Sequence, residues 1–358
     1  RFSAVGPALR GARRSIPIVK WRALGPGRRR LVVLAALNWA PAQLAARLLC
    51  RLVLLWDRGR GADGAVIFIP EGWGDYITEL IGYLRIPVTC FSYSIRGRVR
   101  QIFPRRRGET STSSPYVIFP LESPPPEPLR RFSTVSSELD IMFRSGRWEL
   151  SFRGLPVLWE RGAGELMFDW QCPTRLRPGE TRAWRRHLRE VMRLRSWPPP
   201  ASRSPYYRFG GERWLESLVV RSHRSIRADC LDTVYCQVPT FVEGNRKVLD
   251  VLTATRSGRL VVIELKPHRE IGLLLQGLDY WDRVRRHLAG GDFQKAGYFP
   301  GIELSSEPPL LYLVSPLFEF HPIMPVLRSY LSPVVRFECT GINADWKRGL
   351  KVVRRFTL

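Results

Sequence analysis

The sequence contains few of the residues that staple small domains or bind zinc. Its 358 residues include six cysteines and five histidines. No two cysteines form a Cys-x-x-Cys pair, and none combines with histidine at zinc spacing. Neither a zinc ribbon nor a disulfide framework is therefore supported, and a reducing, cytoplasmic location is expected. A chain of this length is expected to form about two domains, each able to bury its own core.

A long uninterrupted apolar run is also missing. The nearest approach is residues 31–56, where a proline, a glutamine and two arginines interrupt the run well short of ~18 apolar residues. We therefore expect no transmembrane helix and no stable membrane association. The arginines at 28–30 followed by this apolar run resemble the start of a signal peptide. The apolar run begins late in the sequence, however, and no clear cleavage site follows it. The chain begins with Arg1 rather than Met, which is consistent with a missing N-terminus.

Acidic residues are scarce relative to basic ones. The chain has 57 Lys and Arg against 32 Asp and Glu, a net charge of +25. Residues 205–358 hold 22 basic and 16 acidic residues, a net charge of +6, so residues 1–204 carry the remaining net charge of +19. Such a field concentrates polyanions, and we expect a nucleic acid, DNA in particular, as the partner. A basic protein of the membrane surface, resting on residues 1–60 alone, is an alternative.

Residues 1–204 are expected to form a basic α/β region that binds nucleic acid or plays an accessory role. Residues 1–60, in which Arg47 and Arg51 lie four apart, fit one or two amphipathic helices with a basic face. The proline run at 198–200 favours a domain boundary at residue 204. The other predicted elements are a strand at 65–70, a helix at 74–84, a strand at 86–95, a β-hairpin of 147–154 with 164–170, and a basic helix at 179–195.

The most informative segment is VLDVLTATRSGRLVVIELKPHREIGLLLQGLDYWDRV, residues 248–284. It predicts two strands, 248–255 and 259–266, joined by a three-residue loop. Gly258 ends this loop, where a three-residue hairpin needs a left-handed residue. The segment therefore predicts a tight hairpin with a fixed register.

That register brings charged residues together. If Thr255 pairs with Arg259, Asp250 lies directly opposite Glu264 on one face of the sheet. Lys266, two residues after Glu264, shares this face. Carboxylates this close repel each other unless a divalent cation lies between them, and Mg²⁺ takes one or two carboxylates with waters and phosphate oxygens. We therefore predict a Mg²⁺ site, with Mn²⁺ as an alternative ion.

The predicted reaction is hydrolysis of a phosphodiester bond. The ion would polarise the scissile phosphate and lower the pKa of a bound water, while Lys266 orients that water and stabilises the growing negative charge. An exposed salt bridge is the competing explanation for Asp, Glu and Lys on neighbouring strands.

The same residues carry a resemblance to a known family. The arrangement resembles the PD-(D/E)xK, or restriction-endonuclease-like, nuclease superfamily. Asp250 corresponds to its first motif acid, Glu264-Leu265-Lys266 to its ExK, and Gln276 through Tyr280 to the QxxxY of its RecB-like branch. Leu249 stands where the name-giving pattern has proline. The resemblance covers about residues 210–315.

The resemblance implies a Mg²⁺-dependent deoxyribonuclease of the endonuclease type, built on an αβββαβ core with a mixed sheet flanked by helices. It implies that Gln276 and Tyr280 orient the catalytic lysine and contact the nucleic-acid backbone. The alternative is that Tyr280 and Trp281 are core aromatics. A nuclease-like domain at 205–358 is thus expected, with strands at 309–316, near 333–340 and at 350–356.

A glutamate on the first helix often completes the metal site in this superfamily. Residues 211–220 fit that helix, and we choose Glu216 as the third metal ligand and catalytic residue over Glu212. Solvent exposure of both is the alternative. His268 and Gln237 are weaker candidates for the site.

The sequence leaves other hypotheses open. A catalytically inactive nucleic-acid-binding protein that keeps the nuclease fold is the alternative to the nuclease. A homodimer is possible, because many enzymes of this fold pair to cut both strands. The pattern does not distinguish DNA from RNA by base-specific contacts.

Overall fold

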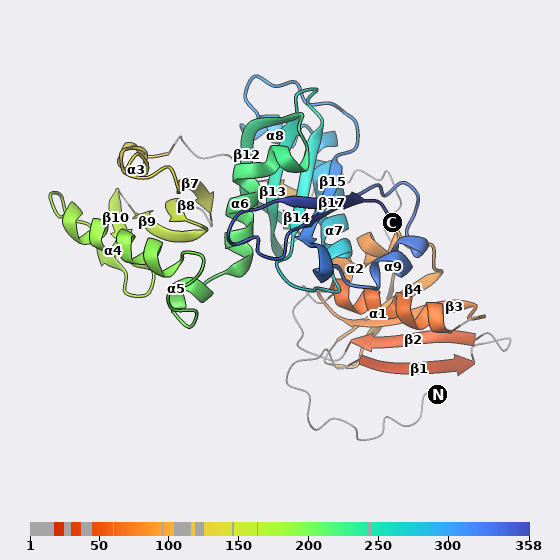
Figure 1. Ribbon diagram of the computed structural model, residues 1–358. Helices are drawn as coiled ribbons and strands as arrows, with labels where there is room; N and C mark the ends of the chain where they lie inside the picture. Colours follow the sequence, from red (N-terminus) through yellow and green to blue (C-terminus); the bar gives the residue numbers. More distant parts are fainter. Residues whose placement is uncertain are drawn as a thin grey trace. The chain divides into compact units, whose positions relative to one another are not determined.

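A computed structural model describes residues 18–24, 30–36, 45–59, 61–94, 96–103, 116–118, 125–144, 147–162, 164–242 and 245–358. Over these residues the chain is mixed α/β, with three sheets flanked by helices (Figure 1). Contacts divide the chain into two compact units. The first is 1–109 with 323–335, and the second is 110–322 with 336–358. The predicted boundary at residue 204 falls inside the second unit.

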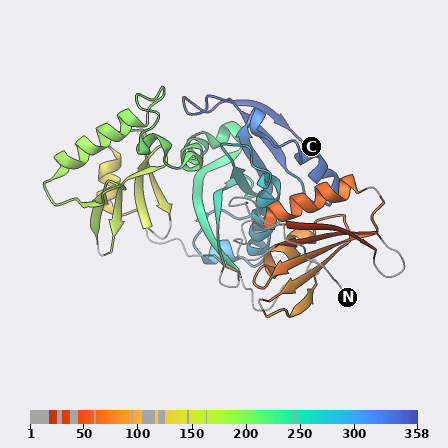
Figure 2. The same cartoon turned by 90° about the horizontal axis from the view of Figure 1, so that it is seen from below.

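The first unit is built on a five-stranded sheet in the order β1-β2-β3-β4-β5. β2, β3 and β4 are parallel, so each pair needs a crossover, which α1 and α2 provide. α1 lies along the sheet (Figure 2) and buries an apolar side that includes Leu48 and Leu52. The strand, helix, strand order predicted over 65–95 is confirmed. The elements are β1 (Ile18–Leu24), β2 (Arg30–Ala36), α1 (Ala45–Arg58), β3 (Gly64–Pro70), α2 (Gly74–Ile81), β4 (Val88–Tyr93), β5 (Val99–Ile102) and α9 (Met324–Tyr330).

The helix prediction for residues 1–60 is partly wrong. β1 and β2 are antiparallel strands, paired from Ile18 with Ala36 to Leu24 with Arg30. The β-branched run in β2 favours an extended chain, and β2 is hydrogen-bonded along both edges, which a helix could not match. Among the described residues of this stretch only α1 is helical, and Arg47 and Arg51 lie on its half-buried side. None of the helices in the described ranges is long and apolar enough to cross a membrane.

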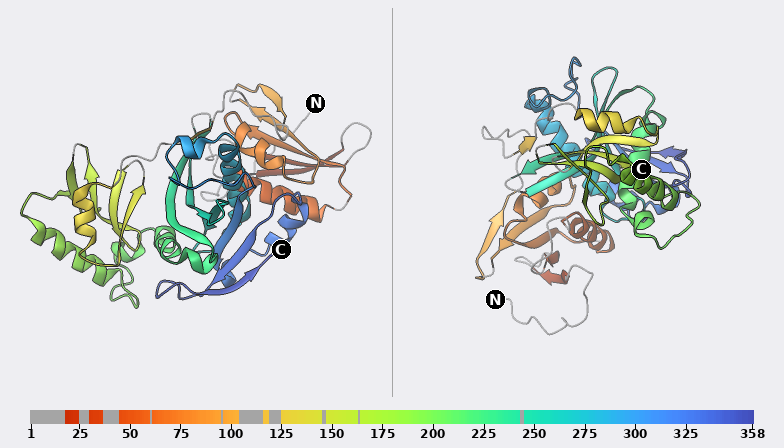
Figure 3. Two further views of the ribbon diagram at one scale, coloured as in Figure 1. Left: turned by 90° about the horizontal axis from the view of Figure 1, so that it is seen from above. Right: turned by 90° about the vertical axis from the view of Figure 1, so that its left-hand side faces the viewer.

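The second unit contains a small antiparallel sheet in the order β11-β10-β9-β8-β7. α4 lies along this sheet (Figure 3) and buries Trp184, Leu188 and Val191 against it. The predicted pairing of 147–154 with 164–170 is wrong, because the strand β9 lies between them and pairs with both. The elements are α3 (Glu127–Ser133), β7 (Leu139–Arg144), β8 (Arg147–Phe152), β9 (Leu155–Arg161), β10 (Glu165–Phe168), β11 (Thr174–Arg175), α4 (Thr181–Leu194) and α5 (Pro205–Arg208).

The largest sheet has seven strands in the order β17-β16-β15-β14-β13-β12-β6. β12, β13 and β14 are antiparallel neighbours, whereas β14, β15 and β16 are parallel. The elements are β6 (Tyr116–Ile118), α6 (Gly211–Ile226), β12 (Cys230–Val242), β13 (Asn245–Thr255), β14 (Leu260–Leu265), α7 (Leu273–Ala289), α8 (Asp292–Lys295), β15 (Leu310–Pro316), the 3₁₀ turn η3 (Leu317–Glu319), β16 (Glu338–Ile342) and β17 (Val352–Phe356).

Two helices cover opposite faces of this sheet. On β14, alternate residues such as Ile263 and Leu265 pack against Trp214 of α6. The other face of β14 meets α7, where Gly277 lies against Glu264 and Leu313. The helix, three strands, helix, strand order expected between α6 and β15 is found, and β16 and β17 add strands at the edge as expected.

Candidate active site

The hairpin of β13 and β14 has the predicted turn and register. Gly258 has a φ of +78°, the left-handed conformation that favours glycine. The backbone N–H of Thr255 donates to the carbonyl of Arg259 at 2.8 Å. Further along, Val251 pairs with Ile263, so the paired numbers keep the same sum and Asp250 is set opposite Glu264. The sequence prediction for this hairpin is confirmed.

Asp250, Glu264 and Lys266 come together at the end of the hairpin. Lys266 Nζ lies 3.1 Å from Glu264 Oε1, and Asp250 Oδ2 accepts a hydrogen bond of 3.2 Å from the backbone N–H of Leu265. Glu264 is 1% exposed and Asp250 is 9% exposed. Glu264 Oε2 receives no hydrogen bond from an N–H or hydroxyl group of the described residues, and the Asp250 carboxyl lies within hydrogen-bonding reach of the Glu264 carboxyl. The structure thus brings these three side chains together at one end of the hairpin.

Burial dominates the electrostatics of the two carboxyl groups. Burial raises the pKa of Glu264 well above its ordinary value, and the neighbouring charge of Asp250 raises it further against the opposing charge of Lys266. Burial also raises the pKa of Asp250. For Lys266, burial lowers the pKa, but the charges of Glu264, Asp250 and Glu212 together outweigh burial and raise it. The ammonium group of Lys266 therefore keeps its proton. The two carboxyl groups beside it are buried and have little contact with solvent.

The two glutamates of α6 take different positions. Glu212 forms an ion pair with Lys266 Nζ. Glu216 is 1% exposed, forms an ion pair with Arg144, and accepts a hydrogen bond of 2.6 Å from Gln237 Nε2. Burial raises the pKa of Glu216 to about 8, while the charge of Arg144 lowers it and that of Asp250 raises it. Solvent exposure does not describe Glu216, which lies within electrostatic reach of Asp250.

The residues of the QxxxY segment lie on α7, on the sheet face that carries Glu264. A Cβ placed on Gly277 would lie 3.5 Å from Glu264 Cβ and 2.6 Å from Leu313 Cδ2, so glycine permits the helix to approach the sheet here. Burial raises the pKa of Tyr280 well above its ordinary value, and the charges of Glu264 and Asp250 raise it further. Gln276 Oε1 is buried without a hydrogen-bond partner in the described part of the chain. Tyr280 is thus a neighbour of the carboxyl pair.

The weaker candidates divide between the site and the surface. Gln237 on β12 belongs to the site through its hydrogen bond to Glu216. His268 is exposed, and no hydrogen bond or ion pair joins its side chain to another described residue.

Arg144 is the site residue that the sequence analysis missed. It lies at the end of β7, 1% exposed, with Nη2 on Glu216 and Nε 3.6 Å from Glu149 Oε1. Its position is 72 residues before Glu216. The only signal in the sequence is its place in an alternating strand, on the same side as the buried Met142. Arginine at such a position is usually exposed, so the pattern alone gives no reason to assign it to the site.

The carboxyl pair fits a divalent cation of the magnesium type. No group of three or more His, Cys, Asp and Glu side chains in the described ranges is placed to hold a metal ion. Mg²⁺ requires only one or two protein carboxylates, because waters and phosphate oxygens complete its shell. Glu264 Oε2, opposite Asp250, receives no hydrogen bond from an N–H or hydroxyl group of the described residues and is an oxygen that could bind such an ion. Comparisons of the chain with protein-family models and with curated proteins find no match.

Proposed function

We propose that the chain is a metal-dependent nuclease of the PD-(D/E)xK type that hydrolyses phosphodiester bonds in DNA. The observation that carries this proposal is the meeting of Asp250, Glu264 and Lys266 at one end of the β13–β14 hairpin, where a carboxylate oxygen of Glu264 receives no hydrogen bond from an N–H or hydroxyl group of the described residues. The order α6, β12, β13, β14, α7, β15 around this site supports the same assignment, because it is the order expected of the αβββαβ nuclease core.

The side chains have separate roles in this proposal. Asp250 and Glu264 would hold Mg²⁺ or Mn²⁺, which when bound polarises the scissile phosphate and makes water a stronger nucleophile. Lys266 carries a fixed positive charge 3.1 Å from Glu264, where it can stabilise negative charge that develops on the phosphate. Tyr280, from α7, keeps its proton and is available as a hydrogen-bond donor to a phosphate oxygen.

A basic helix supports nucleic acid as the substrate. Exposed arginines recur along α4 at intervals of three and four residues, which places them on one face opposite the buried Trp184 and Leu188. Of these arginines, only Arg193 has an ion-pair partner among the described residues, namely Glu190. Unpaired arginines in a row suit the phosphates of a nucleic-acid backbone. The members of the stripe are Arg182, Arg185, Arg186, Arg189 and Arg193.

Cleavage assays on active-site variants test the proposal. Purified protein would be incubated with Mg²⁺, Mn²⁺ or EDTA and with labelled single-stranded, double-stranded and branched DNA and RNA. Glu264→Gln and Lys266→Ala are expected to abolish cleavage while keeping binding at low salt. Glu127→Gln, the same change at an exposed glutamate of α3, is the control and should cleave like the wild type. Cleavage that continues undiminished in both active-site variants would rule out this site.

The second candidate is a nucleic-acid-binding protein that keeps the nuclease fold without turnover. One observation favours it: Lys266 is engaged by Glu212, and Glu216 by Arg144, so both side chains already have partners. The same assays separate the candidates. Salt-dependent binding with no cleavage of any DNA or RNA form in Mg²⁺ or Mn²⁺ would favour this second function.

A further inference from the structure

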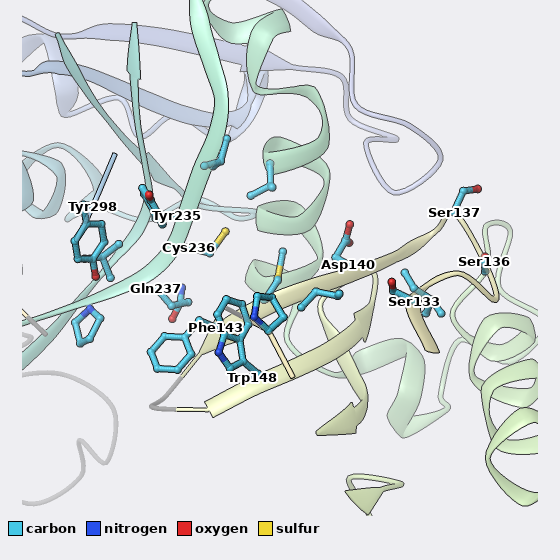
Figure 4. A pocket seen from close by; sticks show the side chains of 18 residues that line it. Ser133, Ser136, Ser137, Asp140, Phe143, Trp148, Tyr235, Cys236, Gln237 and Tyr298 are labelled. Carbon is cyan, nitrogen blue, oxygen red and sulfur yellow. The ribbon is translucent and has the colours of Figure 1, made fainter. Parts of the chain in front are cut away.

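A cavity of about 560 Å³ lies in the second unit, between strands β7 and β8 and strand β12 (Figure 4). Its size falls within the range of about 300–1,000 Å³ that is typical of small-molecule sites. One ion pair and one hydrogen bond tie α6 to the β7 wall of the cavity: Arg221 of α6 lies 2.7 Å from Asp140 of β7 and donates to the carbonyl of Ser137 at 2.9 Å. These contacts fix the position of α6 relative to β7 and so help to define the shape of the cavity.

Aromatic rings line two sides of the cavity. Phe143 and Trp148 lie edge to face with ring centroids 5.3 Å apart. Tyr235 and Tyr298, on the other side of Gln237 in Figure 4, are 4.8 Å apart. None of the described residues that line the cavity is Lys or Arg. The walls therefore suit a flat, uncharged ring and offer no cation to hold a phosphate.

The cavity adjoins the candidate active site. Gln237 lines the cavity and also donates to Glu216 at 2.6 Å. That contact uses Nε2, so the amide oxygen of Gln237 can act as a hydrogen-bond acceptor. The next residue, Cys236, also lines the cavity and lies within electrostatic reach of both Glu216 and Asp250. A group that enters the cavity is thus close to the carboxyl pair.

We propose that this cavity receives an unpaired nucleobase of the substrate strand beside the phosphate that is cleaved. The inference rests on the proposed nuclease function and specifies its substrate class. A base inside a duplex cannot reach aromatic walls, so the substrate is a single strand or a duplex with a bulged, mismatched or flapped nucleotide. Stacking on the rings supplies the affinity, Gln237 accepts a hydrogen bond from the base edge, and the phosphate stays outside the cavity, whose described lining carries no Lys or Arg.

Binding in EDTA tests the proposal without cleavage. Fluorescence anisotropy would compare three labelled DNA hairpins that are fully paired, carry one bulged nucleotide, or carry an abasic site at the bulge. The full chain is expected to bind the bulged base more tightly than the abasic form by roughly 5- to 150-fold, the range of one stacked base. Equal affinity for the base and the abasic form would overturn the proposal.

Variants locate the base. Trp148→Ala should bring the ratio of the two affinities towards one, and Trp148→Phe should restore it. Trp197→Ala, which removes an exposed tryptophan outside the cavity lining, is the control and should leave the ratio unchanged. A full ratio in folded Trp148→Ala would overturn the proposal. If Trp148→Ala does not fold, the wild-type protein is tested with 2-aminopurine as the bulged base. Stacking in the cavity should quench the fluorescence of this base, and an absence of quenching would overturn the proposal.

The outcomes separate this proposal from the nuclease function. Cleavage in Mg²⁺ without a difference between base and abasic hairpins overturns the cavity proposal and leaves the nuclease intact. A preference for the unpaired base without cleavage supports the cavity and favours the inactive binding protein. An absence of any salt-dependent nucleic-acid binding overturns both.

Discussion

Replacing Arg144 by methionine removes one half of a buried ion pair. The guanidinium is 1% exposed and binds Glu216, itself 1% exposed, through Nη2. Its Nε lies 3.6 Å from Glu149, a third buried charge. Methionine fills much of the same volume but leaves both carboxylates without their main cation. Gln237 still donates one hydrogen bond to Glu216.

The size of the effect follows from the burial of the pair. Removing one partner of a buried ion pair costs about 3–5 kcal/mol, because the remaining charge is desolvated and uncompensated. Burial raises the pKa of Glu216 to about 8 even with Arg144 present, so the carboxyl is charged, and the full cost of losing Arg144 is expected, only above that pH; the measurement is therefore made at about pH 9. Changing Glu216 to Gln in the same protein removes that charge and is expected to recover about 1–3 kcal/mol of the loss.

Urea denaturation of the two single variants and the double variant measures these terms. Arg130→Met is the matched control, since Arg130 pairs with Glu127 on the surface of α3, and it should change the free energy of unfolding by less than about 1 kcal/mol. The reasoning is refuted if Arg144→Met costs no more than this control. It is also refuted if Glu216→Gln adds a further loss in the Arg144→Met background.

Three further changes test other parts of the structure. Gly258→Ala should destabilise the protein more than Gly164→Ala, as measured by paired urea melts. Both glycines have positive φ, but of these two positions only at Gly258 would an added Cβ meet a backbone oxygen, 2.0 Å away. Gly277→Ala should cost roughly 1–3 kcal/mol in the same assay and lower cleavage, because either the buried Leu313 side chain or α7 must shift beside the carboxyl pair. Burial lowers the pKa of His287 despite the nearby Asp292, so the unfolded chain takes up a proton at this histidine before the folded protein does as the pH falls below 6.5. The free energy of unfolding of the wild type should therefore fall at low pH relative to that of His287→Gln. Parallel urea melts of the two proteins at pH 5 and pH 8 measure this difference.

The hairpin and its flanking helices can be predicted from sequence because local rules determine them. Gly258 fixes the turn, the turn fixes the register, and the period of two then puts Asp250, Glu264 and Lys266 on one face. These steps involve residues within about twenty positions of each other. The α7 segment follows from its own helical pattern, and Gly277 explains how closely it approaches.

The errors lie where non-local pairing decides the structure. Residues 18–24 and 30–36 are strands because β2 finds partners on both edges, which spacing of arginines along residues 1–60 does not reveal. Residues 155–161 form the strand β9, whose apolar run carries no alternation to mark it. Arg144 belongs to the site only because β7 meets α6, a contact that no local pattern encodes.

The position of Arg144 changes what the boundary at residue 204 means. A proline-rich stretch indicates where a chain leaves one sheet, but it does not show where the contacts that complete a site end. β7 supplies the cation for Glu216 and one wall of the aromatic cavity, and Asp140 binds Arg221 of α6. The small sheet is therefore part of the candidate site rather than an appended binding module. A domain limited to residues 205–358 would leave Glu216 without its cation and open the cavity to solvent, so the carboxyl site and the cavity are expected to fold as one unit with the small sheet.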